Sequence, residues 1–250
     1  MLETFYIGKN IIELDIVDST NNYASELVVK KEALEGTVVI AHFQGKGKGQ
    51  RGNVWTSEPG KNLTFSLVLK PKKVTPSEAF IISKLVSLAI CKYIEAVVEE
   101  DVFIKWPNDI YVGQKKICGI LIENQFKGKN FECAIVGIGL NVNQSNFQNL
   151  PRVTSLLLEL KKELELRSVL DGLLKSIEIC YLQFQQDGAT AIHEEYLSNL
   201  LFIGEMRRYK TFEGEMIGKI SNVLSNGQVE IETEDGQLFN FDIKELEFVF

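Results

Sequence analysis

The stretch that decides the fold is KWPNDIYVGQKKICGILIENQFKGKNFECAIVGIGL, residues 105–140. With the residues just before it, this stretch contains short runs rich in β-branched and apolar side chains, at 102–105, 109–112, 116–123 and 131–140. Turn signals such as Pro107-Asn108 and Gly113 separate these runs, so each is predicted to be a strand. Because adjacent short strands favour hairpins, we expect an antiparallel arrangement here.

Helices and further strands flank this stretch on both sides. Apolar and β-branched runs predict strands at 11–17, 37–43 and 62–70. Ser19-Thr20-Asn21 is typical of a helix start, and Thr75-Pro76-Ser77-Glu78 predicts a capping box before a long helix that ends near residue 98. Apolar residues at helical spacing predict later helices at 155–160, 169–186 and 191–201. The predicted fold class is therefore α+β, a mixed α/β body.

The chain changes character near residue 200. From there to the C-terminus it has ten acidic and five basic residues in short alternating segments. Asn226-Gly227 and Asp235-Gly236 divide these segments, and an Asx-Gly pair between alternating runs is a strong hairpin signal. We therefore predict a mixed α/β domain over residues 1–199 and a small antiparallel barrel over residues 200–250.

Composition and charge limit the classes of function. The chain has 250 residues, 45% of them hydrophobic, and a net charge of -7, which is typical of an ordinary globular protein and not of a nucleic-acid binder. The four cysteines form no CxxC pair and are expected to be reduced core thiols, and the two histidines are too few for a zinc site or a charge-relay triad. We find no signal peptide and no apolar run long enough to span a membrane, so we expect a cytoplasmic protein.

A glycine-rich loop at residues 44–53 is the first unusual feature. Its segment 47–52 matches GxGxxG, but a turn and a strand follow it where a dinucleotide-binding fold needs a helix. The loop carries Lys46, Lys48 and Arg51 and no acidic residue. Its glycines and cations are suited to hold an anion. The alternative is a solvated surface loop.

Three further strings have both a structural and a functional interpretation. The string at 105–109 predicts a rigid turn whose Asn and Asp side chains bond either the backbone or a ligand. Lys116 begins an otherwise apolar strand. Either its charged end reaches solvent at the point where the buried part of the strand ends, or it belongs to a functional site. Gly137 and Gly139 within a strand indicate a sheet bend or the close approach of a ligand.

Taken together and in this order, these strings closely resemble the biotin protein ligase family. The matching residues are Ser19-Thr20-Asn21, the loop that ends at Trp55, and the strings at 105–109, 116–123 and 137–141. The resemblance runs from about residue 11 to the C-terminus. Because the first motif is reached by residue 19, the chain resembles the short form of the family, and we expect neither an N-terminal DNA-binding domain nor DNA binding.

The resemblance implies a fold and a two-step reaction. The fold is a mixed β-sheet with helices on one side, related to class II aminoacyl-tRNA synthetases, followed by a small C-terminal SH3-like β-barrel. In the first step the biotin carboxylate attacks the α-phosphate of ATP, with Mg2+, to give biotinyl-5′-AMP and pyrophosphate. In the second step a specific lysine of a biotin carboxyl carrier protein, part of a biotin-dependent carboxylase, takes the biotin. A homodimer through an edge strand is expected by analogy.

The resemblance also implies roles for individual residues. An anion attacks an anion in the first step, so cations are needed on both groups, and the catalytic candidates are Lys116, Lys48 and Arg51. Biotin binding falls to Ser19, Thr20, Asn21, Gln44, Gly47, Arg51, Lys116, Gly119 and Gly139, with the first two and Gln44 on the ureido group. ATP binding falls to Lys48, Arg51, Trp55, Lys105, Asn108, Asp109 and Asn141. The ligands of Mg2+ stay unassigned, with Asp109 as a candidate.

The loop departs from the family pattern. Many members carry arginines at several loop positions, where this chain has Lys48, Gln50 and Asn53. Lysine keeps the charge but cannot form the bidentate fork of arginine, and Gln50 is neutral. We therefore expect biotinyl-5′-AMP to leave this loop faster than it leaves an all-arginine loop.

Two alternative functions stay open. A lipoate or other small-acid ligase on the same scaffold would differ at the end of the pocket that binds the ureido ring, where Ser19-Thr20 and Gln44, together with the string at 105–109, favour biotin. The other alternative is a non-catalytic biotin or nucleotide sensor, or a nucleic-acid-binding module that uses the basic loop. The net charge and the position of Lys116 in a buried strand argue against it.

Overall fold

A seven-stranded sheet organises the larger part of the molecule. The computed structural model describes residues 4–147 and 150–249. The strand order is β1-β2-β3-β7-β6-β5-β4, with bounds β1 (Ile11–Val17), β2 (Val38–Gln44), β3 (Leu63–Leu69), β7 (Asn130–Leu140), β6 (Lys115–Lys127), β5 (Asp109–Val112) and β4 (Val102–Lys105). The strands β1 and β2, which the helix α1 (Thr20–Val29) connects, pair in parallel. All other strand pairs in this sheet are antiparallel. The predicted antiparallel run at 102–140 is confirmed.

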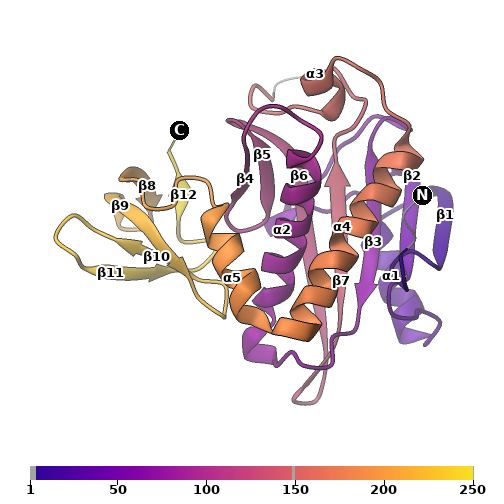
Figure 1. The fold of residues 1–250 in the computed structure, drawn as a ribbon, viewed down its shortest axis with the longest axis horizontal. Coiled ribbons are helices and arrows are strands. Elements are labelled where there is room, and N and C mark those ends of the chain that lie inside the picture. The colour runs from indigo at the N-terminus through magenta and orange to yellow at the C-terminus, as the bar shows by residue number, and fades with distance from the viewer. Residues whose placement is uncertain (1–3, 148–149, 250) are drawn as a thin grey trace.

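Helices cover the two faces of this sheet unequally (Figure 1). The helices α2 (Phe80–Glu95), α4 (Leu166–Asp187) and α5 (Ala189–Ser198) lie on one side, where their apolar faces share the main core with Ala134, Val136 and Ile138 of β7. Successive strand residues point to opposite faces, and Ile135 belongs instead to a small second core with α1. The predicted one-sided helix layer is thus confirmed for these three helices, and α1 covers part of the opposite face.

The start of α2 differs from the sequence prediction. Pro76–Glu78 forms a 3-10 turn, η2, and the α-helix begins at Phe80 and ends at Glu95. The Thr75 hydroxyl donates to the Glu78 carboxylate at 2.6 Å and makes no bond to a backbone N–H. The predicted capping box is therefore wrong in its bonds, because the two side chains bond each other. A side-chain cap does form at α3 (Leu156–Leu160), where Ser155 Oγ accepts from the Leu158 N–H at 3.3 Å.

A five-stranded antiparallel sheet forms the C-terminal part. Its order is β11-β10-β9-β8-β12, with bounds β8 (Arg207–Thr211), β9 (Gly214–Val223), β10 (Val229–Glu232), β11 (Leu238–Phe241) and β12 (Glu247–Phe248). The predicted Asx-Gly turns lie between β9 and β10 and between β10 and β11, with φ of +94° at Gly227 and +80° at Gly236. The domain boundary at residue 200 stays a prediction. There the Ile104 N–H donates to Asn199 O and Ile104 O accepts from the Leu201 N–H.

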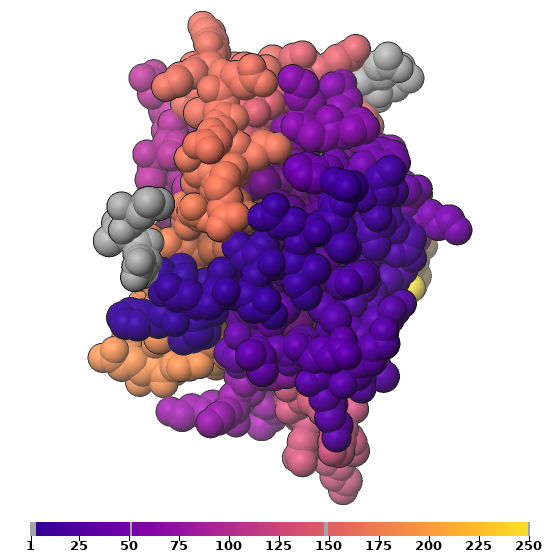
Figure 2. Space-filling view, turned by 90° about the vertical axis from the view of Figure 1, so that its right-hand side faces the viewer, coloured from indigo at the N-terminus to yellow at the C-terminus, as the bar shows by residue number. Residues whose placement is uncertain are grey.

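Residues 5–7 are held against α4. The buried carboxylate of Glu178 accepts the backbone N–H groups of Phe5, Tyr6 and Ile7 at 2.6–2.9 Å. Viewed from the β1 side, the N-terminal segments form one continuous surface beside α4, and the β6–β7 hairpin projects at the bottom (Figure 2).

All four cysteines are buried and free, as predicted. In the described ranges, no helix combines the length and apolar character needed to cross a membrane.

Candidate active site

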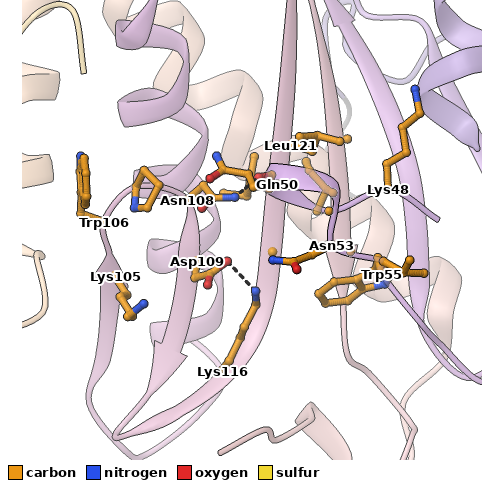
Figure 3. A pocket seen from close by; sticks show the side chains of 18 of the residues that line it. Lys48, Gln50, Asn53, Trp55, Lys105, Trp106, Asn108, Asp109, Lys116 and Leu121 are labelled. Carbon is orange, nitrogen blue, oxygen red and sulfur yellow. Dashed lines mark hydrogen bonds and ion pairs between the residues drawn. The ribbon is translucent and has the colours of Figure 1, made fainter. Parts of the chain in front are cut away.

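A cavity of about 630 Å³ is lined by residues of both sheets. Figure 3 shows side chains that line it. The cavity opens on the sheet face that α1 covers only in part. Residues from α1, the glycine-rich loop, β2, β5, β6 and β7 line it, and so do residues of β8 and β12 from the C-terminal part. A volume of this size suits a small-molecule ligand.

The floor of the cavity consists of strand glycines. Gly119 of β6 and Gly139 of β7 are direct cross-strand partners, and Gly137 lies on the same face two residues along. A Cβ added to Gly139 would lie 2.3 Å from Cε2 of Trp55, and one added to Gly119 would lie 3.0 Å from Cζ3 of the same ring. Glycine is required because the indole ring of Trp55 rests directly on the backbone of both strands.

Hydrogen-bonded polar side chains close one end of the cavity. Gln44 Oε1 accepts from the Thr20 N–H at 2.7 Å and from the Thr20 hydroxyl at 3.1 Å. Ser66 Oγ lies 2.8 Å from Thr20 Oγ1 and donates to Asn21 Oδ1 at 2.6 Å. Ser19, Thr20 and Asn21 are each at most 3% exposed. Since Gln44 accepts with its oxygen, its amide nitrogen presents its N–H groups in another direction.

The start of α1 fixes this polar end. Asp18 accepts the Ser19 N–H at 2.6 Å and the Asn22 side-chain amide at 2.8 Å. These bonds, the one from Asn22 first, lower the pKa of the Asp18 carboxyl. The predicted helix start is confirmed, and Ser19 is the N-cap residue of α1, although it makes no side-chain cap bond. Its side chain instead lines the cavity.

Lys48 of the glycine-rich loop points toward α1 and away from Lys116 (Figure 3). Its Nζ donates to Asn22 Oδ1 at 2.5 Å and lies 3.7 Å from Glu123 Oε1. The other oxygen of Glu123 accepts from the Asn21 side-chain amide at 2.8 Å. Glu123 therefore joins the loop cation to the polar end of the cavity.

The 105–109 string forms the β4–β5 hairpin. Lys105 and Asp109 are the cross-strand partners next to its turn, and the Trp106–Pro107 peptide bond is cis. The Asn108 side-chain amide donates to Ile120 O, and Asn108 O accepts the Ile120 N–H, so Asn108 fixes the hairpin to β6. The buried Trp106 donates its Nε1–H to Gly227 O at 3.0 Å, which ties the hairpin to the C-terminal sheet.

Lys116 stands where the glycine floor meets the hairpin. Its Nζ lies 2.6 Å from Asp109 Oδ1 (Figure 3) and 5.7 Å from the centre of the Trp55 ring. Both side chains of the ion pair are less than one-third exposed. The Lys116 backbone pairs with residues 152–154, since its N–H donates to Arg152 O and its carbonyl accepts from the Thr154 N–H. Arg152 thereby reaches the cavity.

Cations gather along this side of the cavity. Lys105 lies 4.9 Å from the centre of the Phe248 ring in β12, and the adjacent Glu247 is the cross-strand partner of Lys210. The basic lining residues are Lys48, Lys105, Lys116, Arg152 and Lys210. Among the described lining residues the carboxylates are Asp109 and Glu247, so the cavity is locally positive in a chain of net charge -7. No group of three metal-binding side chains occurs within the described ranges.

The structure brings most of the predicted site residues together. Those that line the cavity are Ser19, Thr20, Asn21, Gln44, Lys48, Trp55, Lys105, Asn108, Asp109, Lys116, Gly119 and Gly139. Gly47 and Asn141 do not line it: Gly47 O accepts the Trp55 N–H, and the buried Asn141 amide donates to Thr154 O at 3.0 Å. Arg51 lies in the turn η1 (Gln50–Gly52), and its side chain is outside the described part. The ligand roles of all these residues stay predictions.

Sequence reasoning missed the contributions of Arg152, Lys210 and residues 246–249. These residues carry no motif, and they reach the cavity only because the backbone after Arg152 pairs with Lys116 and because the C-terminal sheet faces the β4–β5 hairpin. The change to an acidic, alternating segment after residue 200 predicts a second domain but gives no signal for its orientation.

Comparison with known proteins gives consistent results. Residues 13–141 match the sequence model of the biotin/lipoate A/B protein ligase family. The chain is 32% identical to the bifunctional ligase/repressor BirA of Bacillus spizizenii and of Bacillus subtilis, over 97% of this chain and 76% of each relative. Its structure is similar to that of the biotin protein ligase from Aquifex aeolicus in complex with biotin and ATP, with a TM-score of 0.78 and 29% identity over 96% of this chain and 98% of the other.

Proposed function

This chain belongs to the biotin/lipoate A/B protein ligase family, and from that premise we propose that it joins biotin to ATP as biotinyl-5′-AMP and transfers the biotin to a lysine of a carrier protein. The observation that carries the proposal is one cavity that combines a polar end, a glycine floor and a group of cations, with Lys116 where the last two meet. The similar Aquifex aeolicus enzyme binds biotin and ATP.

The polar end suits the ureido ring of biotin. A ureido group presents one carbonyl acceptor and two N–H donors. The hydroxyls of Ser19 and Thr20 both donate and accept, and the Gln44 amide N–H groups are donors. The indole ring of Trp55, which rests on Gly119 and Gly139, then offers an apolar surface to the rest of the ligand. Biotin would lie with its carboxylate toward Lys116.

The cations address the difficulty of the first step. A carboxylate oxygen bonds to the α-phosphorus while the bond from phosphorus to the pyrophosphate oxygen breaks, so negative charge gathers at both ends. Lys116, held by Asp109 at 2.6 Å, would contact the carboxylate and the α-phosphate together. Lys105, Arg152 and Lys210 would hold the remaining phosphates. Lys48 needs to leave Asn22 and Glu123 to take part.

Mg2+ would be bound mainly by the phosphates. This ion commonly takes one or two carboxylates and completes its shell with substrate oxygens and water. Asp109 and Glu247 are the carboxylates that line the cavity within the described residues, so the residues present fit an ion that arrives with ATP.

The second step transfers the acyl group. The amine of a carrier lysine attacks the carbonyl carbon of biotinyl-5′-AMP, AMP leaves with the bonding electron pair, and the new amide loses the amine proton to solvent. The cavity is bounded by two separate parts of the chain, and the loop at 44–53 forms one wall. We also propose that the acceptor of the biotin is a carrier protein and that the reaction takes place in the cytoplasm.

Mass spectrometry tests the first step directly. The purified protein is incubated with ATP, Mg2+ and either biotin or lipoate, without carrier. Biotinyl-5′-AMP and pyrophosphate with biotin alone are the expected result. Lipoyl-5′-AMP would instead support the lipoate alternative, and no adenylate with either acid would refute the ligase proposal in favour of a sensor.

A further inference from the structure

A second cavity, of about 540 Å³, lies away from the active site between the helical layer and the C-terminal sheet. It is bounded by the start of α2, the α4–α5 junction and the end of β9, which approach one another in Figure 1. Its walls are mainly apolar, with Val74, Ile81, Phe184 and Leu224 among them. Its volume falls in the range of small-molecule sites.

A buried lysine forms part of this cavity wall. Lys84 of α2 is 4% exposed, and its Nζ donates to Val223 O at 2.6 Å and lies 3.0 Å from His193 Nδ1. The rings of Phe80 and Tyr196 flank the ammonium at 5.9 and 5.8 Å. An ammonium has three N–H donors, so these two polar neighbours leave one donor for a further acceptor.

No carboxylate balances this ammonium among the described residues. The other titratable side chains of the described cavity wall are His193, Lys73 and Glu78. Burial and the nearby Lys84 lower the pKa of His193, which favours its neutral imidazole, and no ion pair joins Lys84 to Glu78 in the described part of the chain. Glu78 instead accepts the Thr75 hydroxyl. Burial lowers the pKa of Lys84 to about 8, which is the expected response of a cation that has lost water without gaining an anion. Buried charges in proteins are normally paired.

We infer that this interdomain cavity binds an aliphatic monocarboxylate, whose carboxylate pairs with Lys84 Nζ and whose chain lies against Val74, Ile81 and Phe184. A single buried cation matches a single negative charge. The inference requires no part of the ligase reaction, because none of these residues lines the active-site cavity.

The position of this site links it to the active site. Residues 222–225 of its wall are followed by Gly227, whose carbonyl accepts the indole N–H of Trp106. A ligand that touches Val223 and Leu224 therefore perturbs the turn that holds the β4–β5 hairpin. Trp106 is consequently a built-in reporter of occupancy.

Titration of the 15N-labelled full chain with sodium decanoate tests the inference. The chain has two tryptophans, and both line the catalytic cavity. The Trp106 indole N–H donates to Gly227 O, so a shift of its signal without a shift of the Trp55 signal reports on the turn at Gly227. We expect saturable binding that shifts the Trp106 signal and leaves that of Trp55 in place. Decanamide, which has the same chain and no charge, should bind about tenfold more weakly or worse.

Two variants make the test specific. Lys84→Met keeps an unbranched apolar side chain as far as the ε carbon and removes the charged Nζ, and it should weaken decanoate binding about tenfold or more without changing decanamide binding. Lys92→Met, on the same helix but outside the cavity wall, is the matched control and should bind decanoate as the parent chain does. Equal binding of decanoate by the parent chain and Lys84→Met, or a shift of the Trp55 signal, would overturn the inference.

Discussion

Replacing Gly139 by alanine tests whether the glycine floor and Trp55 form the ligand site. The added Cβ would lie 2.3, 2.6 and 2.7 Å from three atoms of the Trp55 indole. Ordinary contact needs about 3.5–4.0 Å, so one of the two groups has to move by about 1.5 Å. Gly139 cannot move, because β7 is paired on both sides, to Thr64 of β3 and to Gly119 of β6. The indole ring therefore moves into the cavity.

The size of the effect follows from the cost of overpacking. Forcing an extra methyl group into a packed site costs about 1–3 kcal/mol. If the ligand needs both the floor and Trp55 in place, this cost appears in binding as a loss of about fivefold to a hundredfold in biotin affinity. Fold stability should change little, since Trp55 belongs to an exposed loop segment that can shift without opening the core.

Isothermal titration with biotin measures this loss, and two other glycines supply the comparison. At Gly119 the added Cβ would lie 3.0 Å from the ring, so Gly119→Ala should weaken biotin binding less than Gly139→Ala does. At Gly45 the nearest atom is 3.9 Å away, so Gly45→Ala should bind biotin normally. Parent-like affinity in Gly139→Ala would refute the assignment of this floor to the ligand site.

Three further predictions concern single side chains. Lys116→Ala should lower the rate of adenylate formation about 100- to 1,000-fold while biotin binding is partly kept, whereas the exposed neighbour in Lys115→Ala should be neutral in the same pyrophosphate-release assay. Gln50→Arg should slow the release of biotinyl-5′-AMP, and an unchanged release rate in a stopped-flow measurement would contradict the leaky-loop expectation. Because burial lowers the pKa of Lys84 from 10.5 to about 8, the unfolded chain binds more protons between these values, so the parent chain should gain stability relative to Lys84→Met as pH rises from about 8 to 10.5. Urea unfolding at several pH values measures that difference, and a difference independent of pH would argue against a buried ammonium.

Local sequence features determined the elements and their turns. A run of apolar residues marked β3, and Asx-Gly pairs marked the hairpins of the C-terminal sheet at Gly227 and Gly236. These features act through the backbone preferences of a few neighbouring residues, so they are legible without tertiary contacts. The same locality explains the error at Thr75, because residue types do not reveal whether a hydroxyl will bond a backbone N–H or the carboxylate of Glu78.

The family and twelve of the residues that line the cavity could also be predicted from the sequence, because they lie in short motifs with specific spacing. What only the tertiary structure decided is which distant groups join them. Arg152 reaches Lys116 through backbone pairing, and Lys210 arrives from the other sheet. The burial of Lys84 beside His193 and Val223 is of the same kind. Such long-range contacts depend on how whole elements pack against one another. Packing is set by the shape and burial of many side chains rather than by any local pattern.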